Sequence, residues 1–456
     1  MRIWPSALAC SILAVTAWTA PRPRIWANRY GARGDARTLN TLAIQRALNA
    51  AALSHGIVEF QPGIYLTGAI FVRSHTWLHI GRGVTLRGVD DLAAYPILPT
   101  RVAGIDMRWP AALLNVYRQR RVRIYGHGVL DGQGNYWWKR YWQLRRKYTP
   151  LGLRWASDYD CRRPRLVQIY RSHWVRFSGL RLIRSGFWTV HVCYSRHVRV
   201  SNLTIRNNIG GRGPSTDGID IDSSSRVRVL HCDISDNDDA ICLKAGRDAD
   251  GLRVNRPTTH ITIRDCVVRD GAAGFTIGSE TSGGFRDVLV DGLRVYAPVP
   301  AGIKFKSAHT RGGLAHGIQI RNLILRGVRT VFDFNMNWDP SYSYAKFPAG
   351  WKHIPFYWRI ITQPVLPARR GLPQFRDVRI ANLRALNAGR IFAASAYAAA
   401  PLRNFSFRHL SLTARAAGFI RHARGWKFSH IRVKTTSSAP LQLRDVRRLR
   451  GWPGIK

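Results

Sequence analysis

Residues 198–205 read Val-Arg-Val-Ser-Asn-Leu-Thr-Ile, and residues 227–234 read Val-Arg-Val-Leu-His-Cys-Asp-Ile. Both stretches place apolar residues at the first, third, sixth and eighth positions, with mostly polar residues between them. Two apolar residues separated by one position are typical of a β-strand with one buried face, because successive side chains point to opposite faces. Each stretch therefore predicts two short strands joined by a bend.

The same eight-residue phrase recurs along most of the chain. Clear copies start at Val175, Val198, Val227, Ile261, Val288, Ile318, Val378, Phe405 and Trp426, and a weaker copy starts at Val122. Through the middle of the chain the starts lie 23 to 34 residues apart, so the loops vary while the phrase does not. A phrase repeated at this interval and rich in β-branched residues indicates a solenoid. We predict an all-β fold, a right-handed parallel β-helix of about ten coils, in which each coil buries its apolar face against the next.

The N-terminal end carries two further signals. Residues 1–20 combine Arg2, an apolar stretch and the small-residue motif Val-Thr-Ala, which predicts a secretory signal peptide. A membrane anchor is the alternative, but the stretch is shorter than the roughly 20 residues that span a bilayer. Residues 41–54 show helical spacing and predict a capping helix, because an open β-helix end exposes a sheet edge. We expect residues 21–456 to form a single β-helix domain of a secreted or periplasmic protein without a membrane partner.

Three carboxylates stand apart from the repeat. Asp217 lies in Ser-Thr-Asp-Gly before one apolar run, and the neighbours Asp238 and Asp239 precede a second run 21 residues later. Residues one coil apart lie on adjacent strands, about 4.8 Å from each other. A single Asp at a strand end is usually a turn residue, which we expect for Asp233 and Asp265. A cluster of like charges raises pKa values, which opposes stability and suits acid–base chemistry.

The segments STDGIDI and DNDDAI resemble the two aspartate motifs of the polygalacturonase family of glycoside hydrolases, family 28. The resemblance extends from about Ala27 to Asn337. Further segments that carry it are Tyr30–Ala51, Val58–Gly88, Gly274–Gly284 (GFTIGSETSGG) and Ala301–Gly313 (AGIKFKSAHTRGG). The resemblance implies that the β-helix is a catalytic domain that hydrolyses pectin.

The resemblance also implies a role for each carboxylate. Glycoside hydrolysis needs a carboxylic acid that protonates the leaving oxygen and a carboxylate that activates water, and a separation of about 6.5–9.5 Å gives inversion at an α-glycosidic bond. Asp238 would be the general acid, while Asp217 and Asp239 would hold and deprotonate the water. Such a site needs no metal and no cofactor.

Six further residues are candidates for substrate binding. They are Lys304 and Lys306, in the segment that resembles the family's Arg-x-Lys motif, with Arg311, His191, Glu280 and Tyr342. The two lysines would bind a substrate carboxylate, and the tyrosine would stack on sugar or bind water. His191 ends a segment that resembles the family's Ser-x-Trp-x-x-His.

The chain departs from the family pattern at three positions. Ala272 stands where the family has a histidine, Ser215 replaces an asparagine, and Lys304 replaces an arginine. A lysine cannot form the bidentate contact that an arginine makes with a carboxylate. The three aspartates are retained, so the departures leave open which pectic chain is the substrate, and whether the enzyme is exo-acting.

The charge balance points to an anionic partner. The chain has 71 Lys and Arg against 26 Asp and Glu, a formal net charge of +45, which attracts polyanions. Much of the excess is arginine spread along the chain, and compositional bias accounts for about half of it in our interpretation. No segment resembles a nucleic-acid-binding module. We therefore expect a monomer whose partner is an acidic polysaccharide, pectic galacturonan, and not a nucleic acid.

Two other function classes remain open from the sequence. A Ca²⁺-dependent polysaccharide lyase on the same fold would use Asp238 and Asp239 as a calcium site, release unsaturated products and stop when a chelator is added. A catalytically inactive pectin-binding protein would bind without turnover. The tryptophan-rich stretch Tyr136–Tyr148 is expected to form a loop over the cleft.

Overall fold

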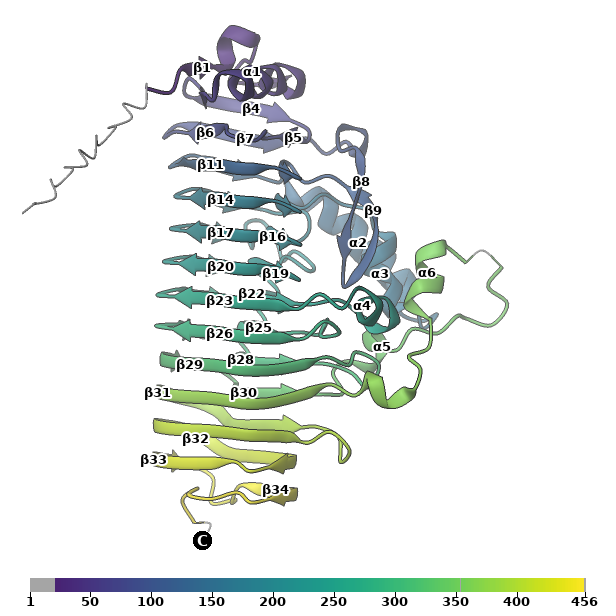
Figure 1. Ribbon diagram of the computed structural model, residues 1–456, viewed down its shortest axis with the longest axis vertical. Helices are drawn as coiled ribbons and strands as arrows, with labels where there is room; N and C mark the ends of the chain where they lie inside the picture. Colours follow the sequence, from purple (N-terminus) through teal and green to yellow (C-terminus); the bar gives the residue numbers. More distant parts are fainter. Residues whose placement is uncertain (1–20, 353, 455–456) are drawn as a thin grey trace, which may run out of the picture.

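The computed structural model describes residues 21–352 and 354–454, so the predicted signal peptide lies outside the described residues. The described chain is one tall stack of parallel coils with a helix at its N-terminal end (Figure 1). The predicted parallel β-helix is confirmed. Within residues 21–352 and 354–454, no helix has both the length and the apolar character that crossing a membrane requires.

Most coils contribute one strand to each of three parallel stacks. The first stack contains β5 (Ile70–Phe71), β10 (Leu114–Tyr117), β13 (Val167–Tyr170), β16 (Val190–Cys193), β19 (Ile219–Asp222), β22 (Asp239–Lys244), β25 (Ala273–Ile277), β28 (Ala301–Lys306) and β30 (Thr330–Asn335). The second contains β1 (Arg24–Trp26), β3 (Ile57–Glu59), β6 (Trp77–Ile80), β11 (Arg120–Gly126), β14 (His173–Ser178), β17 (Arg196–Ser201), β20 (Ser225–Leu230), β23 (Thr258–Arg264), β26 (Phe285–Asp291) and β29 (Leu314–Arg326). The third contains β2 (Asp35–Leu39), β4 (Gly63–Thr67), β7 (Val84–Gly88), β12 (Val129–Asp131), β15 (Arg181–Ile183), β18 (Thr204–Arg206), β21 (Asp233–Ser235), β24 (Val267–Asp270) and β27 (Arg294–Tyr296). The last coils are built from β31 (Gln374–Ser395), β32 (Leu402–Arg424), β33 (Lys427–Thr435) and β34 (Gln442–Arg447).

The repeated phrase maps onto the second and third stacks. Its first two apolar residues lie in one strand and its last two in or next to the following strand, and in the coil that begins at Val198 all four are buried. The bend between the strands is made by Asn202, His231 and Asp265 in successive coils, each with a φ of 53° to 55°. Asn and Asp adopt this left-handed conformation more readily than most residues, so Asp265 is a bend residue.

The N-terminal end of the stack is covered by α1. This helix runs from Thr41 to Ser54, as predicted, and buries Ile44, Leu48 and Ala51 against the first coils. At the other end, the ring of Trp452 packs against those of Phe392 and Phe428. Both ends of the apolar column are therefore shielded from water.

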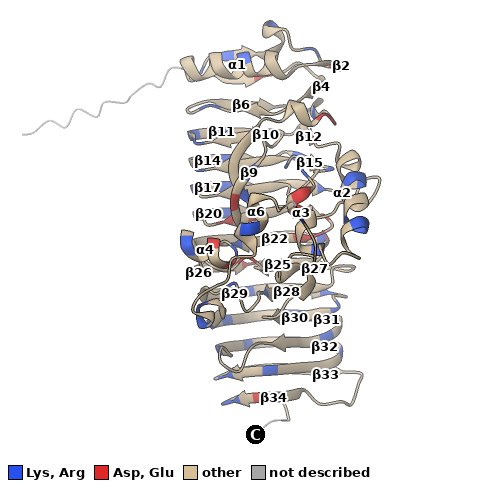
Figure 2. Ribbon diagram, turned by 90° about the vertical axis from the view of Figure 1, so that its right-hand side faces the viewer, with Lys and Arg blue, Asp and Glu red and all other residues tan. Residues whose placement is uncertain are grey.

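Insertions stand beside the first stack and form a wall (Figures 1 and 2). They comprise the antiparallel hairpin β8 (Ile97–Val102) and β9 (Ile105–Pro110) and the helices α2 (Gly134–Tyr148), α3 (Ser157–Asp160), α4 (Asp248–Val254), α5 (Pro340–Ser343) and α6 (Phe356–Ile361). Short 3-10 turns lie at Ala27–Tyr30, Leu92–Ala94, Arg154–Ala156 and Ala368–Gly371. The wall has its own apolar cluster, which includes Trp109, Trp155 and Trp358.

The tryptophan-rich stretch is a helix, so the prediction of a loop was wrong. In α2, Trp137, Trp138 and Tyr141 share one face at helical spacing and are buried. The indole Nε1 of Trp138 donates a hydrogen bond to the carbonyl of Ser185, at 2.8 Å. These two tryptophans therefore anchor the wall to the solenoid and are not free to stack on sugar.

Candidate active site

The register between β19 and β22 brings the three aspartates together. Ile219 pairs with Ile241 and Ile221 with Leu243, and the same offset places Asp217 beside Asp239. The Gly218 amide donates to the Asp239 carbonyl at 3.1 Å, which fixes the two strand starts against each other. Asp239 is thus the residue that follows Asp217 at the same position of the next coil, and Asp238 lies next to this pair.

The three carboxylates form one tight group. One oxygen from each of Asp217, Asp238 and Asp239 can be chosen so that all three lie within 4.8 Å of one another. Asp217 and Asp239 are buried, and Asp238 is half-buried. Asp217 and Asp238 line a cavity of about 120 Å³ between the first stack and the wall. The cavity is also lined by Ala103, Arg154, Asp158, Phe187, Trp188, Ser215, Lys244, Ser279, Glu280, Lys306, Trp338, Asp339 and Tyr342.

Two buried lysines compensate part of the negative charge. The Nζ of Lys306 lies 2.7 Å from Asp239 Oδ2. The Nζ of Lys244 lies 3.2 Å from Asp217 Oδ2, 3.4 Å from Asp220 Oδ1 and 3.5 Å from Glu280 Oε2. Each lysine ends the strand that carries it, so alternation along β22 and β28 places both ammonium groups in the cleft. Unpaired buried carboxylates would be costly, and the lysines lower that cost.

The two adjacent aspartates have opposite pKa shifts. Burial, together with the neighbouring charges of Asp217 and Asp239, raises the pKa of Asp238 to about 7. Burial also acts to raise the pKa of Asp239, but the ammonium groups of Lys306 and Lys304 outweigh it and lower that pKa to about 2. At mildly acidic pH, Asp238 is therefore protonated while Asp239 is ionised. This pairing of an acid with a base is what acid–base catalysis requires.

A second pair of carboxyl groups is also held at raised pKa values. Burial and then the carboxylate of Asp220 raise the pKa of Asp217 well above its ordinary value. Burial raises the pKa of Asp220 to about 7, although Lys244 opposes the shift. Of the three predicted catalytic aspartates, Asp239 is the one that stays ionised at low pH.

The predicted residues Glu280 and Tyr342 meet at the cavity. The Tyr342 hydroxyl donates to Glu280 Oε1 at 3.2 Å, and both side chains are buried. Burial acts to raise the pKa of Glu280, but Lys244 and Arg311 outweigh it and lower that pKa. Tyr342 itself packs under the guanidinium groups of Arg154 and Arg247, at 5.1 Å and 4.8 Å from its ring centroid.

Lys304 and Lys306 approach one face of Trp338. Their Nζ atoms lie 6.0 Å and 4.2 Å from the centroid of its ring. Lys304 is half-buried and Lys306 is almost fully buried. Cations next to a half-buried aromatic ring that lines the cavity form a suitable contact surface for an acidic sugar.

Two predicted substrate ligands are not brought to the cavity. Arg311 is fully buried, forms an ion pair with Asp248 and donates its Nε hydrogen to the Ser279 carbonyl at 3.2 Å. His191 is also fully buried, with its Nε2 3.7 Å from Asp222 Oδ2. Burial and then the charge of Arg165 lower the pKa of His191 to about 4. We therefore withdraw both residues as direct ligands, because neither faces the cavity.

The sequence reasoning missed two groups at the site, Lys244 and Asp158. Lys244 was not identified, although a lysine that ends an otherwise apolar strand beginning at the aspartate pair is a detectable signal. Trp188 lies over that ammonium, with its ring centroid 4.9 Å from Nζ. Asp158, from the wall, accepts a hydrogen bond from Ser215 Oγ at 2.7 Å. No sequence signal indicates Asp158, because its approach depends on how the insertion folds back.

The aspartate cluster is also a conceivable cation site, since three carboxylate oxygens lie close together. Hard cations such as Ca²⁺ favour such oxygen ligands. Here Lys306 and Lys244 already contact two of the three carboxylates. A divalent cation would have to share those carboxylates with two ammonium groups, so the electrostatics favour a site that works without one.

Comparison with known proteins identifies the family. Residues 79–346 match the family model described as glycosyl hydrolases family 28. The chain is 30% identical over 334 residues to a probable polygalacturonase of Vitis vinifera, a match that covers 70% of this chain and 65% of that relative. It is 26% identical over 379 residues to an exo-poly-alpha-D-galacturonosidase of Dickeya chrysanthemi, covering 74% of this chain and 62% of that relative. The matches thus span less than two thirds of either relative.

A solved structure shares the fold. The crystal structure of a hyperthermoactive exopolygalacturonase from Thermotoga maritima superposes with a TM-score of 0.75 at 24% identity, and the match covers 91% of this chain and 93% of that one. The family model covers more than half of the chain and includes the three aspartates, both lysines of the cleft and Glu280. The chain therefore belongs to the glycosyl hydrolases family 28.

Proposed function

We propose that this protein is a glycoside hydrolase that cleaves α-glycosidic bonds in acidic pectic polysaccharide. The observation that carries the proposal is the adjacent pair Asp238 and Asp239, with pKa values of about 7 and about 2, at a cavity that also presents lysines. The polygalacturonase relatives support the substrate class. We also propose that residues 21–456 form one catalytic domain of a monomeric protein that is secreted or periplasmic.

In the proposed mechanism, the Asp238 carboxyl donates its proton to the glycosidic oxygen as the bond to the anomeric carbon breaks. Asp239 accepts a proton from a water molecule, whose oxygen forms the new bond to the anomeric carbon. Asp217, in line with Asp239, orients that water. Lys306 keeps Asp239 ionised, since its ammonium lies 2.7 Å away.

We propose that Lys304 and Trp338 bind the acidic sugar itself. Lys306 is already engaged with Asp239, while Lys304 is half-buried and forms no ion pair in the described part of the chain. A sugar carboxylate placed near Lys304 would bring the apolar face of the ring over Trp338. Because a lysine offers a point charge and not a fork, recognition here would be less strict than with an arginine.

Inversion is the stereochemistry we propose, because a third carboxylate is present to hold a water next to the base. Retention is the alternative, because the nearest oxygens of the three carboxyl groups lie within 4.8 Å of one another. Inverting enzymes typically hold their two carboxyl groups about 6.5–9.5 Å apart, and retaining ones roughly 5 Å apart. In a retaining mechanism Asp239 would attack the anomeric carbon directly. Proton NMR of the first-formed anomer decides between them: a β-anomer from an α-linked substrate supports inversion.

We further propose exo-action. The wall from β8–β9, α3 and α5 contributes Ala103, Asp158 and Tyr342 to the cavity, so the site is enclosed on the wall side. An enclosed site accommodates a chain end more readily than a continuous chain. The Dickeya relative, named as an exo-enzyme, supports the same proposal.

The test is a product analysis on polygalacturonate, xylogalacturonan and rhamnogalacturonan oligomers, with and without chelator. Saturated products of one or two sugars that are unaffected by chelator would support exo-hydrolysis and identify the substrate. Unsaturated products absorbing in the ultraviolet would show a lyase. Binding of every substrate without any turnover would overturn the proposed activity and leave a pectin-binding protein.

A further inference from the structure

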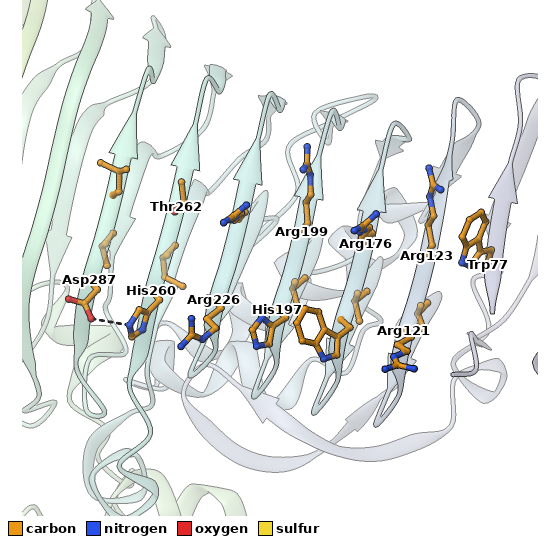
Figure 3. Close-up of a pocket in the computed structure, with 18 of the residues that line it drawn as sticks. Trp77, Arg121, Arg123, Arg176, His197, Arg199, Arg226, His260, Thr262 and Asp287 are labelled. Carbon is orange, nitrogen blue, oxygen red and sulfur yellow. Dashed lines mark ion pairs between the residues drawn. The ribbon is translucent and has the colours of Figure 1, made fainter. Parts of the chain in front are cut away.

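A ladder of arginines runs along the second stack, on a different set of strands from the aspartates. In register, Trp77 of β6 pairs with Arg123 of β11, followed by Arg176 of β14, Arg199 of β17 and Arg228 of β20. Figure 3 shows labelled members of this row side by side on successive strands. Neighbouring strands lie about 4.8 Å apart, so the four steps from Trp77 to Arg228 span roughly 19 Å.

A second row runs parallel to the ladder at the start of each strand. It contains Arg121, Trp174, His197 and Arg226, each with a φ between 54° and 61°. The Trp174 and His197 rings are stacked, with centroids 4.0 Å apart and planes inclined by 8°. Trp174 is 53% exposed although it stacks on His197, and so large an exposed fraction is unusual for a tryptophan.

The two rows line a groove of about 1080 Å³. Asp287 is the only acidic residue among the described residues that line it, and it lies at one end, paired with His260 at 3.5 Å. Figure 3 shows that pair and the row of basic side chains beyond it. The middle of the groove is therefore strongly positive.

The ladder arginines are unpaired, and what distinguishes them from other unpaired arginines of the solenoid is that four of them, from Arg123 to Arg228, lie in register on successive strands. Across residues 21–352 and 354–454, no carboxylate lies within ion-pair distance of Arg176, Arg199 or Arg228. On the third stack, by contrast, Arg206 and Arg269 both form ion pairs with Asp233. The second stack has such pairs too, because Arg264 and Arg321 lie next to Asp291. Compositional bias explains many arginines, but it does not explain why the consecutive coils of Arg176, Arg199 and Arg228 have no carboxylate partner while the coils beyond them do.

Such a ladder opposes folding unless an anion neutralises it. Like charges directly opposite each other on neighbouring strands are destabilising, and a parallel β-helix fixes them one strand spacing apart. The exposed ring of Trp174 adds a surface on which a sugar ring stacks. The half-buried Trp77 ring lies 4.5 Å and 4.7 Å from the guanidinium carbons of Arg22 and Arg123, which it helps to hold at the end of the row. The feature thus combines regularly spaced cations with aromatic faces along a straight line.

We propose that this groove is a second binding site for a linear acidic polysaccharide, separate from the catalytic cavity. The ligand is a chain of uronic acid sugars, whose carboxylates contact the arginines and one of whose ring faces contacts Trp174. The proposal rests on the proposed function in one respect: the same polymer would occupy both sites, so the groove would hold the enzyme on its substrate. A single-stranded nucleic acid also carries anions and stacking faces, and we treat it as an outcome of the test.

The test compares two triple variants that remove the same charge. The ladder variant is Arg176→Gln, Arg199→Gln, Arg228→Gln. The control variant is Arg384→Gln, Arg432→Gln, Arg444→Gln, all exposed arginines of the C-terminal coils without ion pairs among the described residues. Binding of long polygalacturonate, fully methyl-esterified pectin and poly(dT) is measured by affinity electrophoresis at low and moderate salt. For binding, all proteins carry Asp238→Asn to limit degradation of the polymer.

We expect the ladder variant to bind polygalacturonate roughly tenfold more weakly than its parent at low salt, with a shallower salt dependence, and the control variant to change by about twofold at most. In the otherwise wild-type background, turnover of trigalacturonate should be unaltered in both variants. Equal weakening in both variants, or none in either, would overturn the proposal. So would a loss confined to poly(dT). If no pectic substrate is cleaved but ladder-dependent binding of polygalacturonate persists, the proposed hydrolysis fails and the groove stands.

Discussion

Replacing Lys306 by methionine should move the low-pH limit of activity. The substitution keeps an unbranched side chain, one heavy atom shorter, but removes the ammonium that lies 2.7 Å from Asp239 Oδ2. Asp239 must be ionised to accept a proton from water. Its folded-state pKa is lowered to about 2, although burial acts in the opposite direction.

The size of the effect follows from the two opposing contributions. The pKa of Asp239 falls from an ordinary 3.8 to about 2, and a shift of this size corresponds to about 2 kcal/mol in favour of the ionised form. Without Lys306, burial dominates and the pKa rises to 3.8 or above. At pH 3 the wild-type group is then about nine-tenths ionised and the variant group about one-seventh, so activity should fall at least sixfold. The same linkage removes about 2 kcal/mol of stability above pH 4, because a lowered carboxyl pKa stabilises the fold above its unfolded value.

The assay is kcat/KM on the best pectic substrate between pH 3 and pH 8. Thermal melting at each pH shows that the protein is folded. Lys304→Met is the matched comparison, since it removes a cation that makes a smaller contribution to the same pKa. We expect the acid limit to rise by nearly two pH units in the Lys306 variant and by less in the Lys304 variant. An unmoved acid limit in a folded Lys306 variant would refute the assignment of Asp239 as the base.

Further predictions concern the acid, the upper pH limit and the second lysine. Asp238→Asn should lower kcat by about 10²–10⁴ without altering the melting temperature, because the general acid is lost; a loss under tenfold would exclude Asp238 from that role. Wild-type kcat/KM should decline above about pH 7, where Asp238 with its raised pKa loses the proton it donates; a decline that begins near pH 4 would contradict this. Lys244→Met should destabilise the protein by about 1–3 kcal/mol in urea unfolding, chiefly because Glu280, whose pKa Lys244 lowers, loses its cation, whereas Asp217 and Asp220 with their raised pKa values can take up protons; an unchanged free energy of unfolding would contradict this. Chelator should leave turnover unchanged, and restoration of activity by added Ca²⁺ would favour a lyase.

The fold could be read from the sequence because the repeat is local. Each phrase specifies two strands by alternation, and a bend by residues such as Asn202 that accept a left-handed conformation. Stacking then follows from the need to bury the apolar face. The prediction of a loop for the tryptophan-rich stretch was wrong, because it rested on the position of the stretch between two coils of the repeat. The buried face of Trp137, Trp138 and Tyr141 is visible only when the stretch is tested for helical spacing.

The sequence could predict those site residues that lie at the starts of neighbouring strands, because the repeat fixes their positions relative to each other. Asp217, Asp238 and Asp239 converge because their coils are stacked in register. Arg311 and His191 follow the resemblance in sequence, yet the folded chain buries them against Asp248 and Asp222. Whether a residue near the cleft lines the cavity or is buried behind it depends on the insertions that form the wall. The conformation of these insertions does not follow from the repeat.

One physical constraint connects the cleft and the groove. In a parallel solenoid, side chains at the same position of successive coils lie about 4.8 Å apart, so equal charges at that position repel strongly. In the cleft this repulsion is reduced by residues of the same chain, because Lys244 and Lys306 form ion pairs with the carboxylates. In the ladder of Arg176, Arg199 and Arg228 no described residue supplies the compensating charge. The fold neutralises the row of carboxylates but not the row of arginines, which is the arrangement expected if an anionic ligand neutralises the arginines. A linear polyanion does so at the smallest loss of entropy for each contact, because its charges are already connected.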